Sequence, residues 1–400
     1  MHLFGKKREK GTTLILHIGS STVDSTVIRH WKDGKIEVLA HSRIPTNFLL
    51  DVDFQAFWRV VKKSFEISLE KLQENFTGRP DSVVCVFTSP WFISQTKIAT
   101  IEREEGFLVD EKLFNKLVEN EIEIFLRHWQ GKMDPLQGKA SLIEYKIIKV
   151  NLNGYRTQKP LGKTVKSLEA YIYISLGVSE AMEAIKKEVN KIFGRVPIQF
   201  HTFPFITFNV LGAVMNTDEG LLFVEIGGEA TDVSVVRKNI LEETISFRRG
   251  KNNLIRKISS EMKTFIEEVP SVLEAYNTEK LNPASMGKIN KLVDESMTDW
   301  LSLFKESLKM ISENFPLPQN ILIIGDHIIQ HEVTKRIEGN TDLAQYTVFE
   351  KPFSITRIRT PVLEDFFSNR KFFDDQKDIF LSLEAIFADR FNNTEEKPTK

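Results

Sequence analysis

The stretch that decides the fold reads LLFVEIGGEATDVSVV and spans Leu221–Val236. Its apolar run stops at Gly227–Gly228 and resumes, with apolar and polar residues alternating, after Asp232. Apolar runs on either side of a glycine turn predict a β-hairpin. Two adjacent glycines also let backbone N–H groups approach an anion closely, because no Cβ intervenes. The stretch therefore predicts a hairpin with a candidate anion cradle at its turn.

A similar pattern occurs near the N-terminus. The segment LHIGSSTVDSTVI (16–28) aligns without a gap over VEIGGEATDVSVV (224–236). Two residue types keep their places in both turns, in the pairs Gly19 with Gly227 and Asp24 with Asp232. A strand–turn–strand repeated in each half predicts two similar lobes that face each other. The alternative is two unrelated hairpins that share common residue types.

The composition excludes several protein classes. A chain of 400 residues predicts two or three compact units, at roughly 150 residues per domain. Its net charge of -1 gives no overall basic field for nucleic acid. Cys85 is the only cysteine, so no disulfide forms within the chain. No apolar run reaches the roughly 18 residues of a membrane span, and the N-terminus lacks a secretory h-region. We therefore expect a cytoplasmic globular protein.

The N-terminus carries a basic cluster behind two apolar residues. Leu3 and Phe4 precede the cations, which are Lys6, Lys7, Arg8 and Lys10. Such a segment either contacts an anionic membrane surface or forms a solvated tail.

The first half of the chain has the pattern of a small sheet, one covering helix and an insertion. Strands are expected at 13–18, 25–30, 36–42 and 82–88, and an amphipathic helix at 54–76. From 89 to about 167 the pattern changes, with a helix expected at 110–129 and a strand at 142–152. We interpret this part as an inserted subdomain.

The second half returns to alternating strands and helices. Before the central hairpin we expect a strand at 168–176, a helix at 179–193, a short strand at 198–203 and a helix at 206–215. After it we expect a strand at 242–247, mainly helix over 252–312, a buried strand at 321–324 and a closing helix at 376–391. Residues 392–400 are polar.

In this order the pieces resemble the actin-like ATPases, and within them the bacterial FtsA/PilM group. Three glycine motifs carry the resemblance, at 18–22, at 225–232 and at 321–325. In that family they are two phosphate loops and an adenosine loop. The insertion at 82–168 is similar to the SHS2 subdomain of FtsA. The resemblance covers nearly the whole chain.

The resemblance implies an α/β fold of two RNase H-like lobes with an inserted SHS2-type subdomain. The implied divisions are a first lobe at 1–81 plus 169–215, the insert at 82–168, a second lobe at 216–391 with a helical subdomain at about 252–318, and a tail at 392–400. The closing helix is expected to pack on the second lobe.

In that family ATP lies between the lobes, with its phosphates between the two hairpin turns. Backbone amides in glycine turns supply an anion cradle, and carboxylates hold magnesium. The resemblance assigns nucleotide contacts to Gly19, Ser20, Ser21, Thr22, Glu225, Gly227, Gly228, Thr231, Asp232 and Gly325. Magnesium, if ATP binds, would be held near Glu225 and Asp232. No residue receives a catalytic role.

This sequence departs from the family pattern at four chemical positions. His17 replaces the first aspartate, and imidazole is a poor ligand for a hard cation. Glu229 replaces a glycine of the second loop and is expected to place negative charge beside the phosphates. Phe203 replaces the glutamate that positions water for hydrolysis. Asp326–His327 replace glycines of the adenosine loop. These changes predict weak or absent ATP binding and negligible hydrolysis.

The resemblance therefore implies a scaffold or adaptor that binds proteins. The leading interpretation is an FtsA-like division scaffold at the cytoplasmic face of the membrane, with FtsZ-like or other division proteins as partners. One alternative is a PilM-like adaptor of type IV pilus assembly, with pilus inner-membrane proteins as partners. Another is an active actin-like ATPase. Self-assembly and peripheral membrane contact are further expectations, and no nucleic-acid partner is expected.

Other motifs give weaker indications. Gly162-Lys163-Thr164 resembles the end of a P-loop, but Thr157 stands where that motif needs glycine. A zinc site at helical spacing would use His327, His331 and Glu332. A phosphate or partner patch, or else a solvated helix face, would use Arg248, Arg249, Lys251, Arg256 and Lys257.

Overall fold

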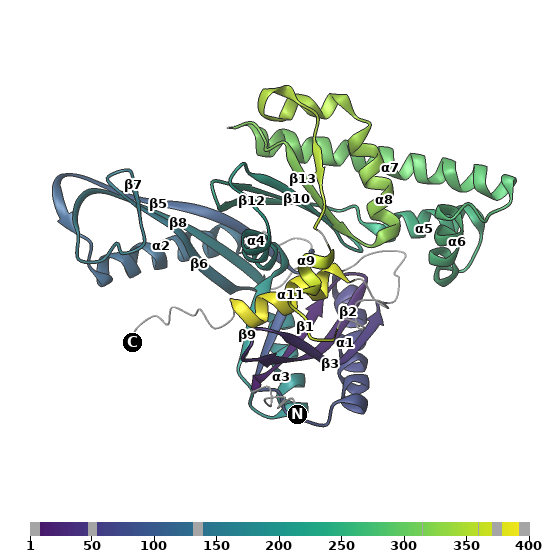
Figure 1. Ribbon diagram of the computed structural model, residues 1–400, viewed down its shortest axis with the longest axis horizontal. Helices are drawn as coiled ribbons and strands as arrows, with labels where there is room; N and C mark the ends of the chain where they lie inside the picture. Colours follow the sequence, from purple (N-terminus) through teal and green to yellow (C-terminus); the bar gives the residue numbers. More distant parts are fainter. Residues whose placement is uncertain are drawn as a thin grey trace, which may run out of the picture.

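The computed structural model describes residues 9–46, 54–130, 139–313, 315–358, 360–369 and 378–391. The N-terminal segment that we considered as a membrane contact lies outside this range up to residue 8, and so does the polar tail from 392. The described part contains two β-sheets with helices on their faces (Figure 1), so the predicted α/β class is confirmed. None of its helices combines the length and the apolar character needed to cross a bilayer.

The first sheet has five strands in the order β3-β2-β1-β4-β9. Their bounds are β1 (Glu9–Ile18), β2 (Thr22–Trp31), β3 (Ile36–Pro45), β4 (Ser82–Phe87) and β9 (Ile198–Thr202). Strand β1 shows how it is covered on both sides. Leu14, Leu16 and Ile18 pack with the helices α1 (Phe54–Asn75) and α3 (Ser179–Phe193), whereas Ile15 points to the opposite face.

The second sheet repeats this arrangement around the central hairpin. Its first five strands are β14 (Ser354–Thr356), β13 (Asn320–Gly325), β10 (Leu221–Ile226), β11 (Thr231–Arg237) and β12 (Ile240–Phe247). One face is covered by α5 (Lys251–Met262), α6 (Val269–Asn277), α7 (Pro283–Ser312) and α8 (His327–Glu338). In β10, Leu222 and Val224 face these helices and Phe223 faces away, as Ile15 does in β1.

The chain enters the insert after β4 and leaves it at α3, both in the first lobe, while the strands of the insert continue the second sheet. Its strands β5 (Phe92–Leu108), β8 (Thr164–Val178), β6 (Ala140–Leu152) and β7 (Tyr155–Thr157) follow β12 in the sheet order. The junction is the antiparallel pair Glu243 with Gln95. The helix α2 (Glu111–Trp129) covers the insert's strands with a core of their own. The insert is therefore a separate core on a shared sheet.

A central core joins the two lobes. The helices α4 (Phe203–Val214) and α11 (Ile379–Arg390) lie between the sheets (Figure 1), and inward residues of both sheets pack against them. We expected the closing helix to pack on the second lobe, but its contacts are mainly with α4, β1 and β3. The residues Leu381–Asp389 are all buried, so this helix needs cover on every side. A place between the lobes supplies that cover.

This packing predicts a large loss of stability for Phe387→Ala. The ring of Phe387 is 2% exposed and lies 4.9 Å from the His201 ring. Removing a buried aromatic ring should lower the free energy of unfolding by about 3–5 kcal/mol. Phe265→Ala is the matched control, because Phe265 is 76% exposed. Denaturant titration checks this; equal midpoints for both variants would show that α11 is not part of the central core.

Candidate functional site

The two hairpin turns face each other and touch. The amides of Gly228 and Glu229 both donate to Ser20 Oγ, each at a distance of 3.0 Å. A Cβ added to Gly228 would lie 2.8 Å from backbone and side-chain atoms of Ser20 and Ser21, so only glycine fits there. The prediction that the duplicated hairpins face each other is confirmed.

The second turn is also held from behind by the start of α5. The amide of Lys251 donates to Gly227 O at a distance of 3.0 Å, and the amide of Asn252 donates to Gly228 O at 2.8 Å. These are amides that a helix cannot satisfy internally in its first turn. The turn is therefore fixed between the Ser20 hydroxyl and the N-terminus of α5.

The ten residues assigned to nucleotide contact all lie at or beside these turns. Gly325 is the most distant in sequence and pairs with Ile226, the last residue of β10. Thr231 has a structural partner, since its hydroxyl accepts from Trp300 Nε1 over 3.0 Å. Their role in nucleotide binding stays a prediction.

Glu229 does not present an unpaired charge to the cleft, which corrects our expectation. Its carboxylate accepts hydrogen bonds of 2.6 and 2.8 Å from Arg256, and a third of 2.8 Å from Asn252. Two other cations of the basic cluster are also paired, Lys251 with Asp326 over 3.0 Å and Lys257 with Glu295 over 2.8 Å. These three cations of the cluster therefore neutralise acids of their own lobe.

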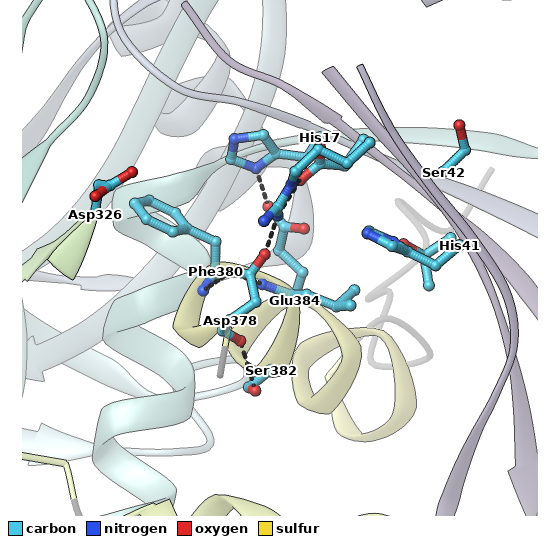
Figure 2. Close-up of polar contacts among 12 residues, drawn as sticks. His17, His41, Ser42, Asp326, Asp378, Phe380, Ser382 and Glu384 are labelled. Carbon is cyan, nitrogen blue, oxygen red and sulfur yellow. Dashed lines mark hydrogen bonds and ion pairs between the residues drawn. The ribbon is translucent and has the colours of Figure 1, made fainter. Parts of the chain in front are cut away.

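His17 lies in a buried pair at the base of the first turn (Figure 2). Its Nδ1–H donates to Glu384 Oε1 of α11 over 2.5 Å, and the rings of Phe380 and Phe203 pack edge-on against the imidazole. Burial disfavours the imidazolium, but the Glu384 carboxylate overcomes this and raises the pKa of His17. His17 therefore fastens α11 to the first sheet, at the position where the family has a metal-side carboxylate.

Two more acids of α11 and its cap bind the first sheet. Asp378 caps the helix by accepting from the amides of Phe380 and Leu381, and it also pairs with Arg43. Asp389 accepts from His30 Nδ1 over 2.8 Å. The helix is thus tied to the first lobe at both ends and in its middle.

Two other acids near the turns also have hydrogen-bond partners. Both carboxylate oxygens of Asp24 accept from Arg43 Nε, Oδ1 at 2.9 Å and Oδ2 at 3.0 Å. Asp232 accepts from Ser89 Oγ over 2.6 Å and from Ser246 Oγ. Burial raises the pKa of Asp232 to about 6, against the opposing effect of these two hydrogen bonds.

Glu225 is buried near the end of β10, opposite Asp232 of β11, and favours its neutral form. Burial, together with the carboxylates of Asp232 and Glu384, raises its pKa well above the usual range. Its Oε2 atom has no hydrogen-bond partner among the described residues. A neutral carboxylic acid is a poor ligand for magnesium, which prefers charged carboxylate oxygens and water.

ATP and magnesium are the groups that this architecture implies, and the residues present do not fit them in this arrangement. The amide pair that would bind a phosphate already binds the Ser20 hydroxyl. Asp24 and Asp232 are hydrogen-bonded, and Glu225 favours protonation. In the described part of the chain, no three His, Cys, Asp or Glu side chains form a metal-binding group. His327, considered for zinc, instead pairs with Glu274 over 2.9 Å.

The state of Glu225 predicts a pH-dependent effect of Glu225→Gln. The unfolded chain releases this proton near pH 4.3, whereas the folded protein retains it. The contribution of Glu225 to the free energy of unfolding should therefore fall by about 1.4 kcal/mol per pH unit above that value, up to the folded pKa. Glutamine has no such proton, so the variant should gain relative stability as the pH rises.

Urea titrations from about pH 4 to about pH 8 measure this difference. The exposed Glu219→Gln is the control, and it should show little dependence on pH. A stability difference for Glu225→Gln that stays constant across the range would contradict a neutral Glu225.

Comparison with known proteins gives a fold but no family. No family model matches the sequence, and no curated protein matches it. The structure of the PilM–PilN type IV pilus biogenesis complex matches with a TM-score of 0.60 and 13% identity, over 94% of this chain and 98% of that one.

Two other solved structures are less similar. MreB 5 of Spiroplasma citri bound to AMPPNP matches with a TM-score of 0.43 and 11% identity, over 92% of this chain and 98% of that one. The ethanolamine utilization protein EutJ from Carboxydothermus hydrogenoformans matches with a TM-score of 0.41 and 12% identity, over 86% of this chain and 84% of that one. The chain has the actin-like fold, and this rests on the match to the PilM–PilN structure at a TM-score of 0.60.

Proposed function

We propose that this chain is an actin-fold adaptor that binds protein partners without hydrolysing ATP, and that it serves a type IV pilus assembly. The observation that carries the proposal is the Ser20 hydroxyl, which accepts both amides of the opposing turn. The lobes are joined there by protein contacts where the family uses a nucleotide. What remains for function is a rigid two-lobed body and its surfaces.

The choice of a pilus assembly is supported by one comparison. The match to the PilM–PilN structure extends over almost all of this chain and of the chain it is compared with, and that structure is a complex of two proteins. At 13% identity the likeness itself extends to the fold alone, so the partner is part of the proposal. The FtsA-like division scaffold is the competing role, because the insert forms one compact unit with its own core, as an SHS2-type subdomain would.

The adaptor needs stiffness between its lobes, and the contacts around α11 supply it. His17, His30 and Arg43 come from the first lobe and pair with acids on or next to one helix. The same helix packs against inward residues of the second sheet, including Phe223. A partner that binds one lobe would therefore find the other in a fixed position.

The first experiment concerns the nucleotide. Calorimetry with ATP and magnesium should show no micromolar binding by the wild type, and a phosphate-release assay should show no turnover. Ser20→Ala should be destabilised by about 1–3 kcal/mol, because two amides lose their acceptor. Ser21→Ala is the matched control on the same turn. Micromolar affinity with steady turnover in the wild type would mean that the chain is a working ATPase.

The second experiment separates the two cellular roles. Deleting the gene in its native organism should remove surface pili and leave division normal. A plasmid copy carrying Glu225→Gln should restore the pili, because the proposed role needs no ionised carboxylate in the cleft. Filamentous cells with normal pili would support the division scaffold instead. Normal pili together with normal division would contradict both roles.

A further inference from the structure

The outer end of the insert carries exposed basic and apolar side chains that the cleft does not use. We call residues 153–167 the insert tip. It includes β7, the last strand of the nine-stranded sheet, which lies at the left extremity of the molecule in Figure 1. Tyr155 is 80% exposed and Leu161 is 49% exposed. The tip contains no acid, and its cations are Arg156, Lys159, Lys163 and Lys166.

Hydrogen bonds from backbone amides hold the parts of the tip together. The two-residue turn Asn153–Gly154 has positive φ at both positions, as a tight hairpin turn requires. Asn153 Oδ1 accepts from the amides of Lys166 and Ser167 over 2.9 and 3.0 Å. The loop that follows β7 is fastened by Gly162, whose amide donates to Val109 O over 2.8 Å.

The aromatic ring and a cation share one face of this edge. Side chains alternate along a strand, so Tyr155 and Thr157 of β7 point to the same side. Lys163 Nζ donates to Thr157 Oγ1 over 3.2 Å, which places the Lys163 ammonium on that side as well. Tyr155 therefore lies beside a positive charge, and both are exposed to solvent.

Acids approach the tip at only a few places in the described part of the chain. Glu102 of β5 pairs with Ser167 at the inner end of the tip, and Glu104 and Glu105 follow it in the same strand, whereas β7 is three strand spacings from β5, or about 14 Å. Asp110 follows Val109, and its carboxylate accepts from the amide of Leu113 over 2.7 Å. Among the residues that the structure describes, none of the four tip cations forms an ion pair. Their charge is therefore available to an anionic surface.

We propose that the insert tip contacts the anionic headgroups of a lipid bilayer. Tyr155 would lie at the interface, where an amphipathic ring is favoured, and Leu161 would enter beside it. The four cations would stand over the headgroups, with their aliphatic stems reaching along the surface. Two exposed apolar side chains cover far less area than a specific protein interface needs, which is roughly 800 Å² per partner.

This inference goes beyond the proposed adaptor role and does not depend on it. Vesicles contain lipid alone, so a failure of the pilus proposal leaves the lipid result unchanged. The full chain is sedimented with vesicles of phosphatidylcholine alone and of equal parts phosphatidylcholine and phosphatidylglycerol. Two double variants test the tip: Lys159→Glu with Lys163→Glu, and Tyr155→Ser with Leu161→Ser. The control is Lys62→Glu with Lys63→Glu, on the exposed side of α1.

The wild type should bind only the anionic vesicles, and less as salt is added, because screening shortens the range of the attraction. Each basic residue near such a surface contributes about a five-fold change in binding, so the charge-reversal pair should lower it more than ten-fold. The Tyr155–Leu161 pair should also weaken binding, and the α1 control should not.

Every variant is also made without residues 1–8, so that the basic N-terminal segment is tested separately. Loss of binding on that deletion alone would assign the contact to the N-terminus and overturn the proposal. The proposal would also be overturned if the tip variants co-sediment with anionic vesicles as strongly as the wild type does. A wild type that does not co-sediment with anionic vesicles would overturn it as well. Unchanged unfolding midpoints for the tip variants confirm that each protein is folded.

Discussion

The hydroxyl oxygen of Ser20 accepts two amide hydrogens from the opposing turn, and this contact determines what the cleft can do. An amide pair in a glycine turn is a ready anion site. Here it is filled by a neutral acceptor from the other lobe, and the turn behind it is held by the first amides of α5. A phosphate that binds these two amides would have to displace the Ser20 hydroxyl.

The rest of the cleft is consistent with that closure. Three charged groups near the turns are already paired with protein groups: Glu229 with Arg256, Lys251 with Asp326, and Asp24 with Arg43. Glu225, which is 2% exposed, favours its neutral form. Below these pairs, α11 is tied to the first sheet by His17 and His30 and packs into the core that both lobes share. The fold of an ATPase is thus kept with a fixed, internally paired centre.

The sequence was informative about local pattern and about the duplication. The alternation in 221–236 and its copy at 16–28 predicted both hairpins and their facing arrangement. Strand β5 was missed because it is largely exposed and charged near Glu102, so the apolar alternation fades. The continuation of the second sheet into the insert could not be predicted, because one registered pair, Glu243 with Gln95, joins them, and no local pattern reveals such a pair.

The site itself was harder to predict for the same reason. Ser20 and Glu229 are 209 positions apart, and His17 and Glu384 are 367 apart, so neither contact has a local signature. One signal did exist: acids at 384 and 389 interrupt an otherwise apolar helix, and buried acids require partners. The charge at Glu229 was misjudged because Arg256 belongs to a cluster that also fits an exposed helix face.

Hydrogen exchange of the Gly228 and Glu229 amides tests the central claim most directly. If Ser20 holds both amides, they should exchange slowly in the free protein, and added ATP and magnesium should leave their rates unchanged. In Ser20→Ala, both amides should exchange much faster. Fast exchange in the free wild type, followed by protection when ATP and magnesium are added, would show that the cleft is open and that a nucleotide closes it.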